Sequence, residues 1–192
     1  DTINGYMAYN HIEGGAGNDT LTAYGAANYL YGDSGNDTIA GHGAANYLYG
    51  GTGNDTVTGY GAYNQLHGQS GDDVLVGAGA INKMYGDVGN DTLTSLAFHS
   101  EMHGGSGNDV IKGFGADNWI YGGSGNDHIV VTGAYNNIEA GSGNDYVYAG
   151  GLANIVDTGT GDDNVVAVAG YNEINTGDGN DVVSAGGAIN II

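Results

Sequence analysis

Eleven aspartates recur at intervals of 18 residues along this chain of 192, and they are its most regular chemical groups: Asp1, Asp19, Asp37, Asp55, Asp73, Asp91, Asp109, Asp127, Asp145, Asp163 and Asp181. Ten of them end a segment of the form Gly-Asn-Asp or Gly-Asp-Asp. Carboxylates and main-chain carbonyls are the ligands that hard cations prefer, and flexible glycines make such carbonyls reachable. The pattern therefore indicates cation binding through oxygen atoms.

Among the hard cations, calcium fits these segments best. Ca²⁺ takes six to eight oxygen ligands in a flexible geometry, and two stacked segments together could complete such a shell. Mg²⁺ demands stricter geometry and keeps its water, while softer metals prefer thiolate or imidazole, which the segments lack. We therefore predict that the aspartates bind Ca²⁺.

The charge of the chain also calls for multivalent cations. The chain has 22 acidic residues, two lysines and no arginine, with a formal charge of −20 at pH 7. Such a charge opposes compaction unless it is neutralised, and it excludes nucleic acid as a partner, because that needs a basic surface. No apolar run approaches the length that spans a membrane.

The aspartates are positioned by an 18-residue repeat that continues without insertion. We number its positions from Gly14, so that position 6 is the aspartate. Copies begin at residues 14, 32, 50, 68, 86, 104, 122, 140, 158 and 176, and residues 1–13 are the tail of a preceding copy. We therefore expect one repeat array over residues 1–192, cut from a longer protein.

Each copy has the pattern of one turn of an all-β solenoid. Positions 1 to 6 form a Gly-rich loop, and positions 7 to 9 form a strand with its aliphatic middle residue inward. A second strand follows with positions 13, 15 and 17 inward, and the Asn at position 15 is expected to stack into a ladder. The 192 residues make about 10.7 coils, and a coil spacing of about 4.8 Å gives a rod of roughly 50 Å.

The loops match a known nonapeptide. GGAGNDTLT, GGTGNDTVT and GGSGNDHIV fit the form G-G-x-G-x-D-x-U-x. Over its whole length the chain therefore resembles the RTX (repeats-in-toxin) calcium-binding proteins. The resemblance implies a right-handed parallel β-roll, calcium from the extracellular medium, and export by a type I secretion system.

The chain departs from the family pattern in its second half, where Asn stands in place of a second aspartate. We therefore expect a single calcium column on the Asp edge, with about nine ions between ten stacked loops. Nine divalent ions would nearly cancel the formal charge of −20. Reduced affinity at most is expected in the imperfect loops, which carry Asp33, Gln69 or Asp87 at position 2 and Ala140, Thr158 or Thr176 at position 1.

Three outward-facing groups could carry further chemistry. His99, Glu101 and His103 alternate along one strand and could bind a transition metal, although surface variation in one degenerate repeat explains them as well. Threonines at positions 7 and 9 resemble an ice-binding surface, but their ranks are broken by Val74 and Val76 and end after Thr94.

Aromatic residues make up the third group, on the outer face of the second strand. They either suit a half-exposed sheet or form an adhesive face for a glycan or for another copy of the protein. These residues, at positions 14, 16 and 18, are Tyr9, Tyr29, Tyr31, Tyr47, Tyr49, Tyr63, Tyr85, Trp119, Tyr121, Tyr135 and Tyr171.

No catalytic motif is present in the sequence, so we expect a non-enzymatic chain. The preferred function is a calcium-binding structural or adhesive segment of a secreted or cell-surface protein, which folds when Ca²⁺ binds. An export and folding module of a type I-secreted hydrolase and an ice-binding adhesin segment remain as alternatives.

Overall fold

The protein, described over residues 1–192 by a computed structural model, is built of parallel β-strands alone. Six coils are single 15-residue strands that bend once, and the other coils are split at the bend into two shorter strands. The strands are β1 Thr2–Gly5, β2 Tyr9–Ala16, β3 Thr20–Ser34, β4 Thr38–Thr52, β5 Thr56–Ser70, β6 Val74–Val88, β7 Thr92–Ser95, β8 His99–Ser106, β9 Val110–Gly113, β10 Asp117–Ser124, β11 His128–Ser142, β12 Tyr146–Thr160, β13 Asn164–Val168, β14 Tyr171–Asn175, β15 Val182–Gly186 and β16 Ile189–Ile191.

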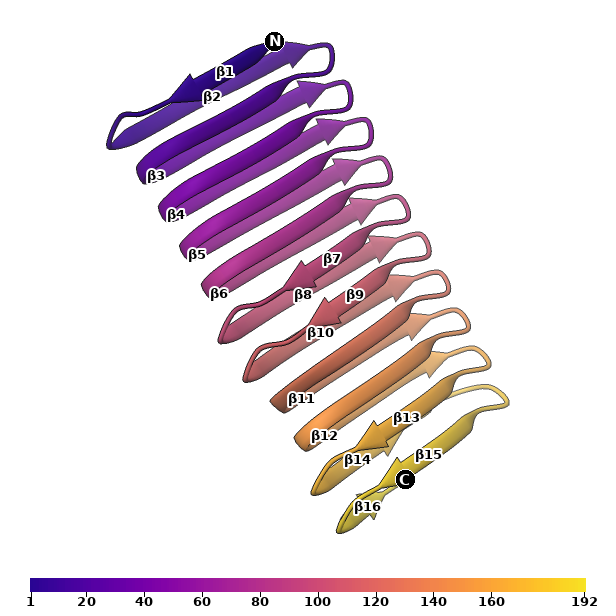
Figure 1. Ribbon diagram of the computed structural model, residues 1–192. Helices are drawn as coiled ribbons and strands as arrows, with labels where there is room; N and C mark the ends of the chain where they lie inside the picture. Colours follow the sequence, from indigo (N-terminus) through magenta and orange to yellow (C-terminus); the bar gives the residue numbers. More distant parts are fainter.

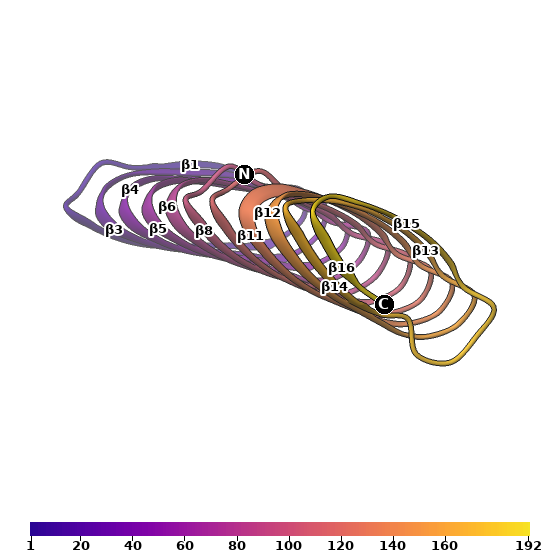
Figure 2. The ribbon, with the colours of Figure 1, turned by 90° about the horizontal axis from the view of Figure 1, so that it is seen from below.

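The coils stack in strict register. Leu21 of β3 pairs with Ile39 of β4, which pairs with Val57 of β5, and every other pairing keeps the same offset of 18 residues. The result is a β-solenoid of about 18 residues per coil, as the repeat predicts. Figure 1 shows the coils as a straight rod, with loops along one edge and bends along the other. Seen from below, each coil is a flattened ring with two layers (Figure 2).

A thin aliphatic core fills the space between the two layers. Positions 8 and 17 supply it, as expected: Leu21 and Ile39 from the first half and Leu30 and Leu48 from the second are fully buried. Each residue packs on the equivalent residue of the next coil, because the register repeats. Burial of a Leu or Ile side chain contributes about 1.5–3 kcal/mol, so the core stabilises the rod through many small identical steps.

The third inward position differs from the prediction. Position 13 was expected to face inward, but Ala26, Ala44 and Ala62 at this position are exposed. Position 10 is buried instead, for example at Ala23 and Val131. The physical reason is the bend: it occupies positions 11 to 13, so inward alternation runs through 6, 8 and 10 and resumes at 15.

The predicted Asn ladder at position 15 is present. The Nδ2 of Asn28 donates to Oδ1 of Asn46 at 2.8 Å, and Asn46 donates in the same way to Asn64. We call this stack, from Asn10 to Asn190, the Asn ladder. From Asn10 to Asn172 it lies inside the rod beside the bends, where it bonds to main-chain carbonyls such as that of Tyr60, and it is interrupted once, at Ser100; Asn190 is exposed. The fold contains no helix of the length and apolar character that crossing a bilayer requires.

Candidate calcium centre

The position-6 aspartates, here called the Asp column, lie where each loop enters the next strand. The nine from Asp19 to Asp163 are at most 3% exposed, although aspartate is rarely buried without a partner. Asp181 is half-buried and Asp1 is exposed. The fold therefore gathers the predicted residues into one continuous column along the loop edge.

One oxygen of each buried carboxylate is satisfied by the backbone. The amide N–H of Asp37 donates to Oδ1 of Asp55 at 2.7 Å, and the amide of Asp55 donates to Oδ1 of Asp73. The same bond links every pair of neighbouring coils from Asp19 to Asp181, at 2.7–3.0 Å. These bonds hold the carboxylates in a fixed orientation.

The other oxygen has no partner. Oδ2 is buried and makes no hydrogen bond in all nine aspartates from Asp19 to Asp163. A buried ionised oxygen without a donor or a cation is strongly unfavourable, because burial removes its water. Nine such oxygens in register indicate a repeated site for a positive group.

The glycines at position 1 leave room for these oxygens. A Cβ added to Gly14 would lie 2.7 Å from Oδ2 of Asp19 and 2.8 Å from the carbonyl oxygen of Gly32 in the next coil. A carboxylate and a carbonyl oxygen thus approach the same point, and neither can donate to the other. This set of hard oxygen donors suits Ca²⁺ and lacks the nitrogen or sulfur that softer metals prefer.

The remaining loop glycines are required by backbone conformation. Position 4 has φ from +112° to +148°, as at Gly17 and Gly179, and an added Cβ in any coil after the first would collide with the carbonyl of the preceding position-4 glycine. Position 2 is left-handed in every loop, so Asp33, Gln69 and Asp87 adopt φ of +73° to +78°. Their departure from the pattern therefore places strain in the backbone.

Three imperfect loops differ at position 1. Ala140 and Thr158 are buried and carry a Cβ where other coils leave space, and Thr176 is half-buried. The nearby Oδ2 atoms of Asp145 and Asp163 are nevertheless buried and unpartnered like the others. The arrangement of the column is thus retained in these coils with less room beside the carboxylate.

Burial raises the pKa of the central carboxylates. The pKa of Asp73 is raised to about 7 and that of Asp127 to about 7, first because of burial and then because of neighbouring aspartates. Burial likewise raises the pKa of Asp55, Asp91 and Asp145 to about 6, against an opposing effect of the backbone hydrogen bond. The column therefore resists carrying its full charge unless a cation accompanies it.

A second ladder on the loop edge was not predicted. The side-chain oxygen at position 5 accepts the backbone N–H of position 5 in the next coil, as from Asn36 to Asn18 at 2.9 Å. In this ladder the backbone N–H of each coil donates to the preceding coil, whereas in the Asp column it donates to the next coil. The Asn or Asp that always precedes the aspartate was the signal for this role, since both side chains supply an oxygen.

His99, Glu101 and His103 face outward from β8, as predicted, but they do not converge on one point. Nδ1 of His99 pairs with Oδ2 of Asp117 at 2.8 Å, while Glu101 contacts Lys83 at 2.6 Å and His103 at 3.2 Å. No group of three His, Asp or Glu side chains in the structure is arranged to hold a metal ion. A cation in the Asp column would therefore depend on backbone carbonyls for most of its ligands.

The aromatic face divides into two kinds of residue. At position 18 six rings form one continuous stack, with centroids 4.4–4.9 Å apart: Tyr31, Tyr49, His67, Tyr85, His103 and Tyr121. Each of these rings stacks on the ring of an adjacent coil, as cross-strand aromatic pairs do. In contrast, Trp119 and Tyr135 have no ring neighbour and are 44% and 61% exposed.

Comparison with protein families gives a match over most of the chain. The model of the RTX calcium-binding nonapeptide repeat, which spans four copies, matches residues 10–39, 40–75, 67–99, 101–129, 123–156 and 157–192. Neither the curated proteins nor the solved structures yielded a match. The family match, the strict register of Gly-rich loops and the parallel β-solenoid agree, and the chain belongs to the family of RTX calcium-binding repeat proteins.

Proposed function

We propose that this chain is a structural and adhesive segment of a secreted or cell-surface protein, and that it folds when calcium enters the Asp column. The observation that carries the proposal is the set of nine buried Oδ2 atoms without a partner. A divalent cation beside each of them would supply the missing positive charge. About nine ions would bring +18 against the formal −20.

The residues expected to hold the ions are the eleven position-6 aspartates, together with carbonyl groups of the loops. In the interior of the column each carboxylate is oriented by its Oδ1 bond and keeps Oδ2 free, as for Asp73. Asp1 and Asp181 lie in the first and last coils of the described residues and are more exposed than the nine aspartates between them. The ion would supply charge neutralisation and cross-linking of adjacent coils.

Calcium binding then becomes folding free energy. Without cations, buried carboxylates oppose one another, and the thin core must balance the entropy of ordering a Gly-rich chain. The chain would stay disordered where calcium is scarce and fold where it is abundant. Such coupling suits export in an unfolded state followed by folding outside the cell.

The adhesive part of the proposal is supported by the outer face of the second-half strands. Exposed aromatic groups such as Tyr9, Trp119 and Tyr135 offer contact area to a ligand or a neighbouring molecule. A glycan and a second copy of the chain are both compatible with such a face.

Far-UV circular dichroism during a calcium titration tests the folding step, with magnesium as the control cation. We expect a cooperative transition from a disordered to a β spectrum with calcium alone. Asp73→Asn should raise the calcium concentration at the midpoint, because it removes a central carboxylate, whereas Asp33→Asn, outside the column, should not. A β spectrum that persists in excess chelator at pH 7.5 would contradict the proposal.

A further inference from the structure

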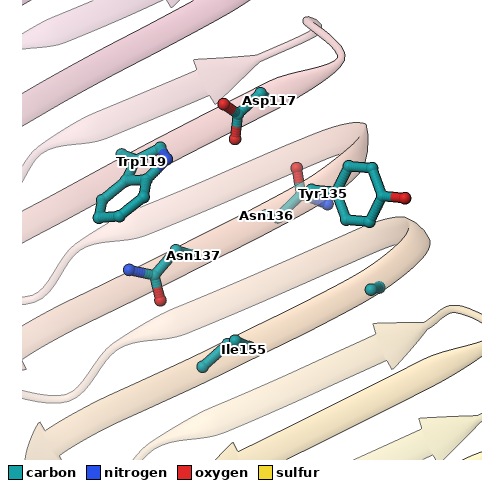
Figure 3. A pocket seen from close by; sticks show the side chains of 7 residues that line it. Asp117, Trp119, Tyr135, Asn136, Asn137 and Ile155 are labelled. Carbon is teal, nitrogen blue, oxygen red and sulfur yellow. The ribbon is translucent and has the colours of Figure 1, made fainter.

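A hollow of about 240 Å³ opens on the outer face of the solenoid, across β10, β11 and β12. It is lined by Asp117 and Trp119 of β10, Tyr135 and Asn137 of β11, and Ala153 and Ile155 of β12. Figure 3 shows the two aromatic rings on opposite sides of the hollow. Pockets for drug-sized ligands measure about 300–1,000 Å³, so this hollow has room for one small group.

The hollow exists because two aromatic rings on a diagonal fail to meet. Trp119 pairs in register with Asn137, and Asp117 pairs with Tyr135, so the rings occupy one diagonal of the grid and the polar side chains occupy the other. The same diagonal elsewhere holds Tyr47 and Tyr63, whose ring centroids are 5.8 Å apart. Tyr47 and Tyr63 are in contact, whereas Trp119 and Tyr135 have no ring partner, so the faces of these two rings stay open.

The surroundings of the hollow are acidic. Four further carboxylates lie on the same face in adjacent columns or coils: Glu101, Glu139, Asp157 and Glu173. The one lysine of this face, Lys83, is already bound to Glu101 at 2.6 Å. An anionic ligand would be repelled here, while a cationic one would be attracted.

The lining favours a cation without hydrogen-bond donors. Asp117 is held in place by His99, with 2.8 Å between Nδ1 and Oδ2, and it is the only carboxylate of the lining. A primary ammonium or a guanidinium carries three to five N–H donors, and the lining offers them few acceptors beyond Asp117, the amide of Asn137 and the hydroxyl of Tyr135. Quaternary ammonium groups carry no N–H bond and need no acceptor, and their attraction to Trp and Tyr faces is a general basis of their recognition.

We propose that this hollow binds a small quaternary ammonium compound of the choline type. The rings of Trp119 and Tyr135 flank the methyl groups, and Asp117 faces the positive charge. Free choline fits better than a phosphocholine headgroup, because the surrounding carboxylates repel the phosphate. Choline would then be one ligand of the proposed adhesive face, and its binding requires folded coils, whatever drives their folding.

Trp119 is the only tryptophan of the chain, so its fluorescence reports directly on the site. We expect choline chloride, added to the calcium-loaded protein, to change this fluorescence saturably with a millimolar dissociation constant, of the order of the weakest specific complexes. The neutral carbon analogue 3,3-dimethylbutan-1-ol has the same shape without the charge and should produce no saturable change. Circular dichroism of the same samples verifies separately that the coils are folded.

Matched variants locate the site. Tyr135→Ala and Asp117→Asn should each weaken choline binding by about tenfold or more, a loss of about 1.4 kcal/mol. Tyr63→Ala removes a ring from the equivalent diagonal and should leave binding unchanged. An equal response to the neutral analogue, a saturable response to a neutral monosaccharide instead of choline, or no response by folded protein would each overturn the proposal.

Discussion

The Asp column and the Asn ladder are two stacks of nearly the same side chain in the same 18-residue register, yet they are satisfied in different ways. In the Asn ladder most amides both donate and accept, as Asn28 does: its Nδ2 donates to Oδ1 of Asn46 at 2.8 Å, and its Oδ1 accepts from Asn10. In the Asp column every carboxylate only accepts, and one of its two oxygens is left buried without a partner. Apart from the gap at Ser100, the first stack is satisfied by its own bonds, whereas the second needs a cation or a proton.

The two edges therefore have different roles, one in stability and the other, under the proposed function, in regulation. Hydrogen bonds of the Asn ladder involve no ion and no titratable group, so in the folded coils they hold the bends whatever the calcium concentration. Under the proposed function the Asp column would respond to calcium, because its buried oxygens would gain a partner when an ion binds beside them. Replacing aspartates of the column by asparagine should therefore reduce the dependence of folding on calcium.

The largest expected effect comes from replacing the central aspartates by asparagine. In Asp55→Asn/Asp73→Asn/Asp91→Asn the backbone bond to Oδ1 is kept, and the new Nδ2 can donate to a nearby carbonyl. Each exchange should stabilise the calcium-free fold by about 1–3 kcal/mol, because it removes a buried unsatisfied group. In excess chelator at pH 7.5 far-UV circular dichroism should show more β structure in the variant than in the natural chain, and urea unfolding in calcium should show the variant to be the less stable of the two.

Asp33→Asn, Asp87→Asn and Asp117→Asn together form the matched control, since these aspartates lie outside the column. They change the net charge by the same amount as the central variant. Equal stabilisation by both variants in chelator would mean that general charge repulsion, and not the buried Oδ2 atoms, limits the fold.

The second prediction concerns pH in the absence of calcium. Asp73 and Asp127 have pKa values raised to about 7 from 3.8, so the folded state holds its protons more tightly than the unfolded state. Stability from this source is fully present below about pH 4 and is lost as the pH rises through 6 to 7. We expect the chain in chelator to show a β spectrum and a melting transition at pH 4.5 and to be disordered at pH 7.5. The triple Asn variant should show a smaller dependence, and a melting temperature that rises with pH would contradict the prediction.

Much of the architecture was predictable because each repeat position recurs in the same environment. The 18-residue register, the aliphatic positions 8 and 17 and the Asn ladder follow from periodicity alone. Position 13 was placed wrongly, because the alternation of a strand says nothing of where a continuous chain bends. The strands themselves are longer than predicted, since β3 and its neighbours continue through that bend.

The residues of the candidate site were predictable from the sequence, but their contacts were not. The spacing brings the aspartates into one column, yet only the fold shows that Oδ1 is bonded and Oδ2 is not. The aromatic face illustrates the same limit. Tyr47 and Tyr63 occupy the same two positions as Trp119 and Tyr135, but only the first pair is in contact, and that difference depends on side-chain packing.

The third prediction repairs a gap in the Asn ladder. Ser100 replaces Asn and bonds to Oγ of Ser95 at 2.7 Å, which leaves Oδ1 of Asn118 buried without a partner. Ser95→Gly/Ser100→Asn restores the composition of the adjacent coils and should stabilise the calcium-loaded protein by about 1–3 kcal/mol. Thermal unfolding measures the gain, and Ser100→Ala serves as the opposite case because it loses the bond to Ser95. A thermal transition unchanged from that of the natural chain would contradict the prediction.

The smallest expected effect concerns Gln69, which adopts φ of +78° at a position where most coils have glycine. A left-handed conformation is unfavourable for such a residue by roughly 1–2 kcal/mol, while glycine loses about 0.5–1 kcal/mol through the entropy of the unfolded chain. Gln69→Gly should therefore stabilise the fold by up to about 1 kcal/mol, measured by chemical denaturation in calcium. Asp33→Gly should gain less, because aspartate tolerates the left-handed region better than glutamine does. If both variants were less stable than the natural chain, the side chains at position 2 would stabilise the loop edge by more than their strained backbone destabilises it. The stability of that edge would then depend on residues other than the position-6 aspartates.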